Sequence, residues 1–368
     1  MKNLLRPARR RHGFSLVEVL VATAVALSAT LAIFQTFAAS EGYRRSATSG
    51  GDANFAGALG AYLLEQDLSM AGYGINSATY LGCPTSGIDS GTGGVARNIA
   101  FNLAPVQITA AGAANQADTF TVVASNSSTT PGPIPFNTAM GTVLDNYQIT
   151  NPFGVTAGDL LVLAQPGLAC TLVQATDTPT ANAVGSQNTV THASTTYRTT
   201  GGTTVRARYN PAGGIGPVYG ATAVMMDMGP APVVNTYYIL NNTLMVDQLV
   251  TGQIGVPVAA NIVQLKALYG RDTVGAGTVT TWDTATPATA AGWSAVLAAR
   301  IALVARSAQP EKANAQGACT TTTALPSVTW EDGTVTVLDV SATANWQCFR
   351  YKVFHATASL RNQIWTPS

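Results

Sequence analysis

The sequence predicts an α+β protein with one long N-terminal α-helix and a mostly antiparallel, β-rich globular head. Three observations support this fold class. Residues 14–39 are predominantly apolar. Residues 52–74 continue with a helical period and end in glycines, and short β-branched segments between Gly, Pro, Asn and Ser clusters follow. The chain therefore divides into a basic leader (1–13), an apolar helix (14–39), an outer helical half (40–75) and a head (76–368).

The leader is positively charged, whereas the helix that follows it is apolar. The leader holds five basic side chains and no acidic one: Lys2, Arg6, Arg9, Arg10 and Arg11. The apolar stretch would form a helix of about 39 Å at ~1.5 Å per residue, enough to cross a hydrocarbon core of ~30 Å. Because basic residues stay on the cytoplasmic side, the leader is expected in the cytoplasm and the head outside it. Without the leader, 14 basic side chains face 18 acidic ones, so no nucleic-acid partner is expected.

Glu18 is the one carboxylate within the apolar helix. A carboxylate at the bilayer centre costs on the order of 2.5–3.5 kcal/mol, and the positive end of the helix dipole lowers that cost near the N-terminus. Ionisable groups inside a membrane are functional candidates. The alternative is a carboxylate that snorkels to the interface.

The segment Gly13-Phe14-Ser15-Leu16-Val17-Glu18 resembles the processing motif of type IV prepilins. The resemblance implies that a prepilin peptidase cuts after Gly13 and methylates the new amino group of Phe14. It further implies that Glu18 pairs with the N-terminal ammonium of a neighbouring subunit as the chain leaves the inner membrane for the pilus.

Two other export signals fit less well. A secretory signal peptide has an apolar core of 7–15 residues, whereas this core is longer and contains Glu18. The arginines of residues 9–11 suggest a twin-arginine signal, but the apolar residues do not follow at the right offset.

In the outer half of the helix, Gly50-Gly51 is expected to loosen or break the helix, and Asp52 can cap a second helical segment. One predicted helix face is expected to pack against the head: Phe55, Leu59, Tyr62, Leu63 and Met70. Gly72 and Gly74 are suited to end this helix.

Residues 64–74 contain an E-x-D-L-x-x-A-G-Y stretch, from Glu65 to Tyr73, that resembles the PilW family of type IV pilus proteins. Residues 261–270, 300–307 and 354–365 resemble the same family. The resemblance implies a minor pilin that helps to prime pilus assembly at or near the tip, with the major pilin and other minor pilins as partners. The alternatives are a J-type pseudopilin of a type II secretion system and a membrane-anchored, adhesin-like binding module.

Four cysteines, none in a CxxC pair, point to two disulfides in an exported protein: Cys83, Cys170, Cys319 and Cys348. The most local pairing, Cys83–Cys170 with Cys319–Cys348, is preferred, and the two other pairings stay open.

Beyond residue 76 the pattern is that of strands separated by loops. Strands are expected over residues 119–125, 160–165, 170–175, 204–209, 223–228, 302–306 and 350–356, and a hairpin over 235–246 turning at Asn241-Asn242. Residues 82–94 and 179–202, which are rich in Ser, Thr and Gly, are expected to be long loops.

The sequence indicates no catalytic site and no cofactor. His192 and His355 are the only histidines outside the leader, and neither lies in a catalytic motif. Asp272 is the one acidic residue of 271–278, so this loop lacks the oxygen ligands of a Ca²⁺ site. The five tryptophans are expected to be core and interface anchors rather than a ligand platform: Trp282, Trp293, Trp330, Trp346 and Trp365.

Overall fold

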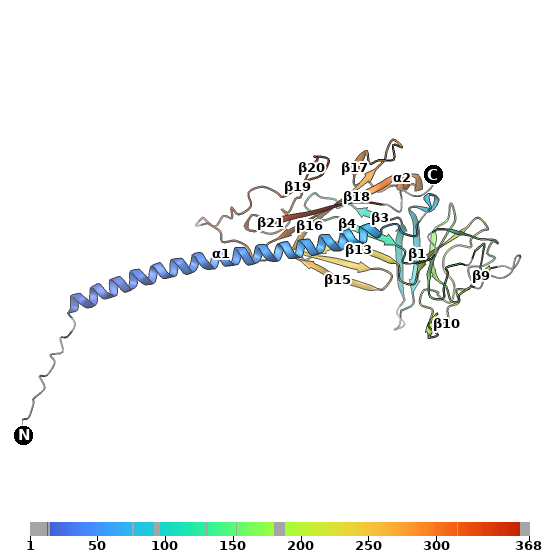
Figure 1. Ribbon diagram of the computed structural model, residues 1–368, viewed down its shortest axis with the longest axis horizontal. Helices are drawn as coiled ribbons and strands as arrows, with labels where there is room; N and C mark the ends of the chain where they lie inside the picture. Colours follow the sequence, from blue (N-terminus) through green and yellow to red (C-terminus); the bar gives the residue numbers. More distant parts are fainter. Residues whose placement is uncertain are drawn as a thin grey trace, which may run out of the picture. The chain divides into compact units, whose positions relative to one another are not determined.

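The computed structural model describes residues 13, 15–75, 77–91, 96–129, 132–151, 153–179, 188–314 and 316–360. The chain divides into two compact units, Met1–Gly51 and Asp52–Ser368. Helix α1 (Leu16–Met70) contributes residues to both. The described part of the first unit is essentially residues 16–51 of α1, and the second unit is the head (Figure 1). The predicted α+β class is confirmed.

Helix α1 passes through Gly50, Gly51 and Asp52 without interruption. The predicted break and the predicted cap at Asp52 are therefore wrong. Each glycine lowers helix stability by only about 1 kcal/mol relative to alanine, and a helix already formed on both sides of the pair needs no new nucleus to continue across it. The helix ends as predicted, because Gly72 and Gly74 adopt φ values of 79° and 78°, a region that glycine enters without steric penalty.

The face of α1 that packs against the head is not the predicted one. Phe55, Tyr62 and Met70 are 73%, 63% and 40% exposed, and Leu59 is also on the exposed side. Of the predicted positions, Leu63 is half-buried. The buried positions are instead small residues and leucines, Ala53, Gly57, Gly60, Leu64 and Leu68, and Ala71 directly after the helix is buried as well. Small residues face the head because its strands approach the helix backbone closely. A Cβ at Gly60 would lie 3.2 Å from Leu244 and 3.3 Å from Leu303.

Three larger sheets build the described part of the head. The first has the order β2-β1-β8-β7-β12-β5, the second β15-β14-β13-β4-β3, and the third β17-β16-β18-β21. Their bounds are β1 Cys83–Asp89, β2 Arg97–Leu103, β3 Val106–Thr109, β4 Thr119–Ala124, β5 Ile134–Pro135, β7 Leu160–Ala164, β8 Cys170–Gln174, β12 Val224–Gly229, β13 Val233–Leu240, β14 Thr243–Gln248, β15 Gln253–Ala260, β16 Ile262–Arg271, β17 Thr281–Asp283, β18 Val296–Arg306 and β21 Tyr351–Ser359.

Smaller elements complete the described head. Three two-stranded ribbons pair β6 (Tyr147–Ile149) with β9 (Asn188–Val190), β10 (Thr196–Arg198) with β11 (Thr204–Arg206), and β19 (Ser327–Thr329) with β20 (Val335–Val337). Short helical turns are η1 Ala78–Tyr80, α2 Ala290–Ser294 and η2 Trp346–Cys348. Pairing between the named strands is antiparallel, except that β1 and β8 run parallel.

Strand β18 is buried on both faces, which explains its nearly continuous apolar sequence. Ile301, Leu303 and Ala305 belong to the main core, which also holds Leu64 and Leu68 of α1. The alternate residues Ala302 and Val304 pack instead against a second cluster around β19 and β20. Figure 1 shows β13 and β15 alongside the end of α1.

The hairpin between β13 and β14 forms as predicted, with Asn241 and Asn242 both at positive φ (50° and 58°). Two predicted loops are wrong in part. Residues 83–89 form β1, because β2 and β8 flank this segment and Gly87 lies so close to Leu172 that an added Cβ would be 3.0 Å from its side chain. Residues 179–202 include β9 and β10, while 180–187 lie outside the described residues.

Candidate functional site

The first unit presents an apolar helix surface that nothing in the described chain covers. An 18-residue window of α1 has a mean hydropathy of 2.2 and none of its residues is buried. By length and composition, this helix could cross a membrane. Exposed large side chains include Leu16, Leu20, Leu27, Phe34 and Phe37. In water such a surface would be costly, so it requires lipid or other apolar helices around it.

The hydroxyl groups in this stretch are already satisfied by the helix itself. Thr23 donates to the carbonyl oxygen of Leu20 (2.9 Å), and Ser28 donates to that of Ala24 (2.8 Å). Thr30 donates to Ala26 in the same way (2.7 Å). Such bonds remove the cost of placing a hydroxyl in hydrocarbon, where water is absent.

Glu18 is different from these hydroxyl residues. It lies in the first turn of α1 and is exposed. No hydrogen bond or ion pair joins its carboxylate to another residue that the structure describes. An anion in the first turn interacts favourably with the helix dipole, but a charge in an apolar surface still needs an external partner. Gly13 and Ser15 precede the helix without secondary structure, and residues 1–12 and Phe14 lie outside the described residues.

The E-x-D-L-x-x-A-G-Y stretch forms the junction between α1 and the head. Asp67 accepts hydrogen bonds from Asn235 Nδ2 and from the Tyr237 hydroxyl, both at 2.7 Å. Gly72 N–H donates to Val123 (2.9 Å), and the carbonyl of Tyr73 accepts from Ser125 N–H (2.8 Å). The stretch thus holds the helix end against β4 and β13, and Glu65 alone of its charged residues is exposed.

The cysteines form two disulfides, Cys83–Cys170 and Cys319–Cys348, which is the most local of the three pairings. The first joins the parallel neighbours β1 and β8. The second joins the segment before β19 to η2.

Asp272 organises its own loop. Its carboxylate accepts four backbone N–H groups, from residues 274–277, at 2.6–3.1 Å. Loss of hydration raises the pKa of Asp272, but the four backbone N–H groups together outweigh that effect and hold the pKa below its ordinary value. No group of three or more His, Cys, Asp and Glu side chains that could hold a metal occurs among the described residues.

The histidines and tryptophans lie apart from the N-terminal motif. His192 stacks on Tyr147 beside a cavity in the head, and His355 lies on β21 beside Trp330. Trp293 and Trp330 are buried as predicted. Trp282 covers the guanidinium of Arg300, and Trp365 lies outside the described residues. Sequence patterns did not indicate the cavity, because its lining comes from three segments without a shared motif.

Two family models match the chain. Residues 234–362 match the model described as type IV pilus-assembly protein W, and residues 8–34 match the prokaryotic N-terminal methylation motif. No curated protein and no solved structure gives a significant match. The first match spans β13 to β21, a range that includes the neighbours of the buried α1 glycines on β14, β15, β18 and β21. The second covers residues 8–15 and the start of α1, including Gly13, Phe14 and Glu18.

Proposed function

We propose that this chain, a PilW-family type IV pilin by its two family matches, is a minor pilin that helps to initiate pilus assembly and sits at or near the tip of the filament. The observation that carries the proposal is the uncovered apolar surface of α1 with a single carboxylate in its first turn. Such a helix is stable only in lipid or among similar helices, and a pilin occupies both environments in turn.

Before assembly, the leader (1–13) lies in the cytoplasm, residues 14–39 span the inner membrane, and the head faces outward. The clustering of basic residues before residue 12 supports this orientation. The two disulfides are consistent with an oxidising compartment for the head. Prepilin peptidase cuts after Gly13 and methylates the amino group of Phe14.

During assembly, the Glu18 carboxylate pairs with the N-terminal ammonium of a neighbouring subunit. An unpaired charge in an apolar environment is strongly unfavourable, and an adjacent opposite charge removes most of that cost. The pairing therefore favours transfer of the subunit out of the bilayer and sets its register in the filament.

The head docks on other minor pilins and connects them to the major pilin. Its exposed α1 face, with Phe55, Leu59 and Tyr62, supports such docking. In this proposal the chain acts through packing and charge pairing, without catalysing a reaction.

Replacing Gly13 with Leu tests the processing step. We expect an unprocessed precursor that retains its leader in the inner membrane, as measured by mass spectrometry of membrane fractions. A Gly42→Leu variant, altered at a helix glycine with no neighbour within 4 Å, is the matched control and should be processed normally. Normal processing of the Gly13 variant would overturn the cleavage assignment.

Replacing Glu18 with Val tests the assembly step separately. We expect normal cleavage and methylation but a loss of the chain from sheared pili, measured by quantitative mass spectrometry. Ser28→Ala, a polar-to-apolar change in the same span whose hydroxyl bonds only within the helix, should be incorporated normally. Unchanged incorporation of the Glu18 variant would contradict the pairing. Recovery of the mature chain in secretion pseudopili rather than in pili would instead identify a J-type pseudopilin.

A further inference from the structure

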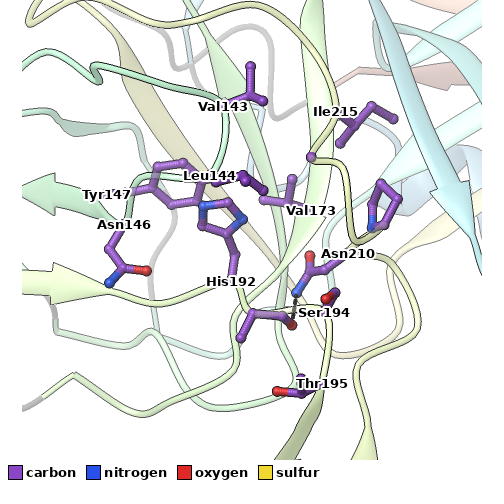
Figure 2. Close-up of a pocket in the computed structure, with 13 residues that line it drawn as sticks. Val143, Leu144, Asn146, Tyr147, Val173, His192, Ser194, Thr195, Asn210 and Ile215 are labelled. Atoms are coloured by element: carbon purple, nitrogen blue, oxygen red, sulfur yellow. Dashed lines mark hydrogen bonds between the residues drawn. The ribbon is translucent and has the colours of Figure 1, made fainter.

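A cavity of about 250 Å³ lies in the head outside the segment that matches the PilW family. Three stretches of the chain line it, residues 143–147, 192–195 and 210–215, together with Val173 of β8. Figure 2 shows His192 lying over the ring of Tyr147 on one side and Asn210 on another. The cavity is thus enclosed by segments that the fold brings together from distant parts of the sequence.

His192 is held in one tautomer. Its Nε2 lies 2.9 Å from the carbonyl oxygen of Asp145. Because a carbonyl oxygen can only accept, Nε2 carries the hydrogen and Nδ1 presents a lone pair. Burial lowers the pKa of His192, which keeps the ring neutral. No described residue donates a hydrogen bond to Nδ1.

The ring of His192 is also fixed in position. It stacks on Tyr147 with the ring centroids 4.3 Å apart and the planes 9° from parallel. Asn210 is also held in place, because it accepts from Gln174 N–H and donates to the carbonyls of Gln174 and Ala193. A preformed cavity of this kind loses little conformational entropy when it is filled.

The remaining lining is neutral and mixed in polarity. Val173 and Ile215 are apolar, while the side chains of Asn146 and Ser194 make no hydrogen bond with any described residue. No carboxylate, lysine or arginine of the described chain lines the cavity. The nearest carboxylate in the same stretch, that of Asp145, is engaged by the N–H groups of Gly141 and Thr142.

We propose that this cavity binds a neutral monosaccharide unit. A sugar hydroxyl would donate to His192 Nδ1, other hydroxyls would bond to the Asn146 amide and the Ser194 hydroxyl, and a C–H face of the ring would contact Val173 and Ile215. A charged sugar would find no counter-ion and would lose hydration without compensation. The volume is below that of pockets for drug-sized ligands, which limits the ligand to about one sugar ring. This binding function is additional to pilus assembly.

The test uses the full mature chain in phosphocholine micelles, which contain no sugar headgroup. Saturation-transfer NMR is recorded with glucose, galactose, mannose and N-acetylglucosamine, and with glucuronic acid and N-acetylneuraminic acid as charged probes. We expect transfer to at least one neutral sugar and none to the charged probes. No transfer to any neutral sugar, or stronger transfer to a charged one, would overturn the proposal. N-acetylglycine methylamide is recorded as a neutral amide probe, and transfer to it alone would overturn the proposal in favour of a peptide ligand.

Variants connect the signal to the cavity. His192→Phe keeps a flat ring but removes both the Nδ1 acceptor and the Nε2–H that donates to Asp145. Asn146→Ala removes an exposed amide without touching the core. Each should weaken binding about three- to ten-fold, the loss expected for one hydrogen bond. Ser341→Ala, at an exposed serine elsewhere in the head, should leave affinity unchanged. Wild-type affinity in both the His192 and the Asn146 variants would place the binding elsewhere and refute the proposal.

Discussion

Gly57 determines how closely the head approaches α1. A Cβ added at this position would overlap the ring of Phe354 on β21. The helix backbone therefore packs directly against an aromatic side chain, which a larger residue would prevent. The small residues of this face are a packing requirement rather than a weakness of the helix.

Replacing Gly57 with Ala should lower the free energy of unfolding of the head by about 1–3 kcal/mol, because overpacking outweighs the gain in helix propensity. Chemical denaturation followed by fluorescence measures it. Gly50→Ala, in the same helix with no neighbour within 4 Å, is the control and should not destabilise the head. If Phe354→Leu fails to relieve the Gly57→Ala defect, the clash is not its cause.

Asp67 links α1 to β13 through two donors. The Tyr237 hydroxyl is buried, and its pKa is raised by burial and by the nearby carboxylate. Asp67 therefore satisfies polar groups that would otherwise be unpaired inside the head.

Asp67→Ala should cost about 1–3 kcal/mol of unfolding free energy, because it leaves the Tyr237 hydroxyl and the Asn235 amide without their acceptor. Tyr237→Phe should cost less, and the double variant should cost less than the sum of the two. Glu65→Ala, two residues away on the exposed side, should change stability by less than about 0.5 kcal/mol. Strictly additive effects at Asp67 and Tyr237 would contradict the coupling.

Arg300 is buried between two indole rings, 4.0 Å from the centre of Trp282 and 4.5 Å from that of Trp330. Its guanidinium pairs with Asp332 at 3.0 Å. The hydroxyl and the N–H of Thr334 both donate to Asp332, and with Arg300 they lower the pKa of that carboxyl to about 2.

A ¹³C NMR titration of Asp332 should give a midpoint near 2. Because this is below the unfolded value of about 3.9, the ionised carboxylate stabilises the head above pH 4, and the effect is lost as the pH falls toward 2. Thr334→Val should move the midpoint upward, whereas Thr357→Val should not. An unperturbed midpoint in the parent chain would show that these bonds do not persist in solution.

At the scale of elements, α1 has two faces with different uses. Small residues and leucines face the head, and larger side chains, including two aromatic ones, face outward. A sequence pattern weighted by hydrophobicity selects the larger side chains as the core, which is why the predicted face was wrong. The close approach of the strands determines which face of α1 is buried. That approach depends on residues far along the chain, such as Leu244 and Phe354.

Phe55→Ser and Tyr62→Ser should leave the unfolding free energy within about 0.5 kcal/mol of the parent value, because both side chains are exposed. Both should reduce recovery of the chain in sheared pili. Leu64→Ala is the contrasting variant and should cost about 2–5 kcal/mol of stability. Normal recovery of the Phe55 and Tyr62 variants would argue against docking through this face.

Other elements could be predicted where local signals were strong. The end of α1 at Gly72, the hairpin at Asn241-Asn242 and the β-branched strand β4 follow from turn chemistry and period alone. Strand β1 (CPTSGID) could not, because it becomes a strand through β2 and β8 rather than through its own composition. The cavity at His192 likewise depends on long-range folding.

At the scale of the whole molecule, the disulfides close loops of different length. The sequence separation is 87 residues for Cys83–Cys170 and 29 for Cys319–Cys348. The chain-entropy model gives about 4.6 and 3.7 kcal/mol of stabilisation for loops of these sizes.

Replacing Cys83 and Cys170 with Ser should therefore lower the unfolding free energy by about 1 kcal/mol more than replacing Cys319 and Cys348. Denaturation of the two double variants under identical conditions measures the difference. The reverse order would mean that strain or residual structure, rather than loop length, governs the two bonds.

The pairing of β4 with β13 brings the two ends of a long segment of the head together. Ala124, the last residue of β4, is the direct pairing partner of Val233, the first residue of β13. The intervening residues 125–232, which carry the sugar cavity, thus leave one sheet and return to it at adjacent positions. The surface loops of this segment can change in length while the pairing of β4 with β13 stays intact. Such changes would alter the outer surface of the head and leave the strands beside the end of α1 in place.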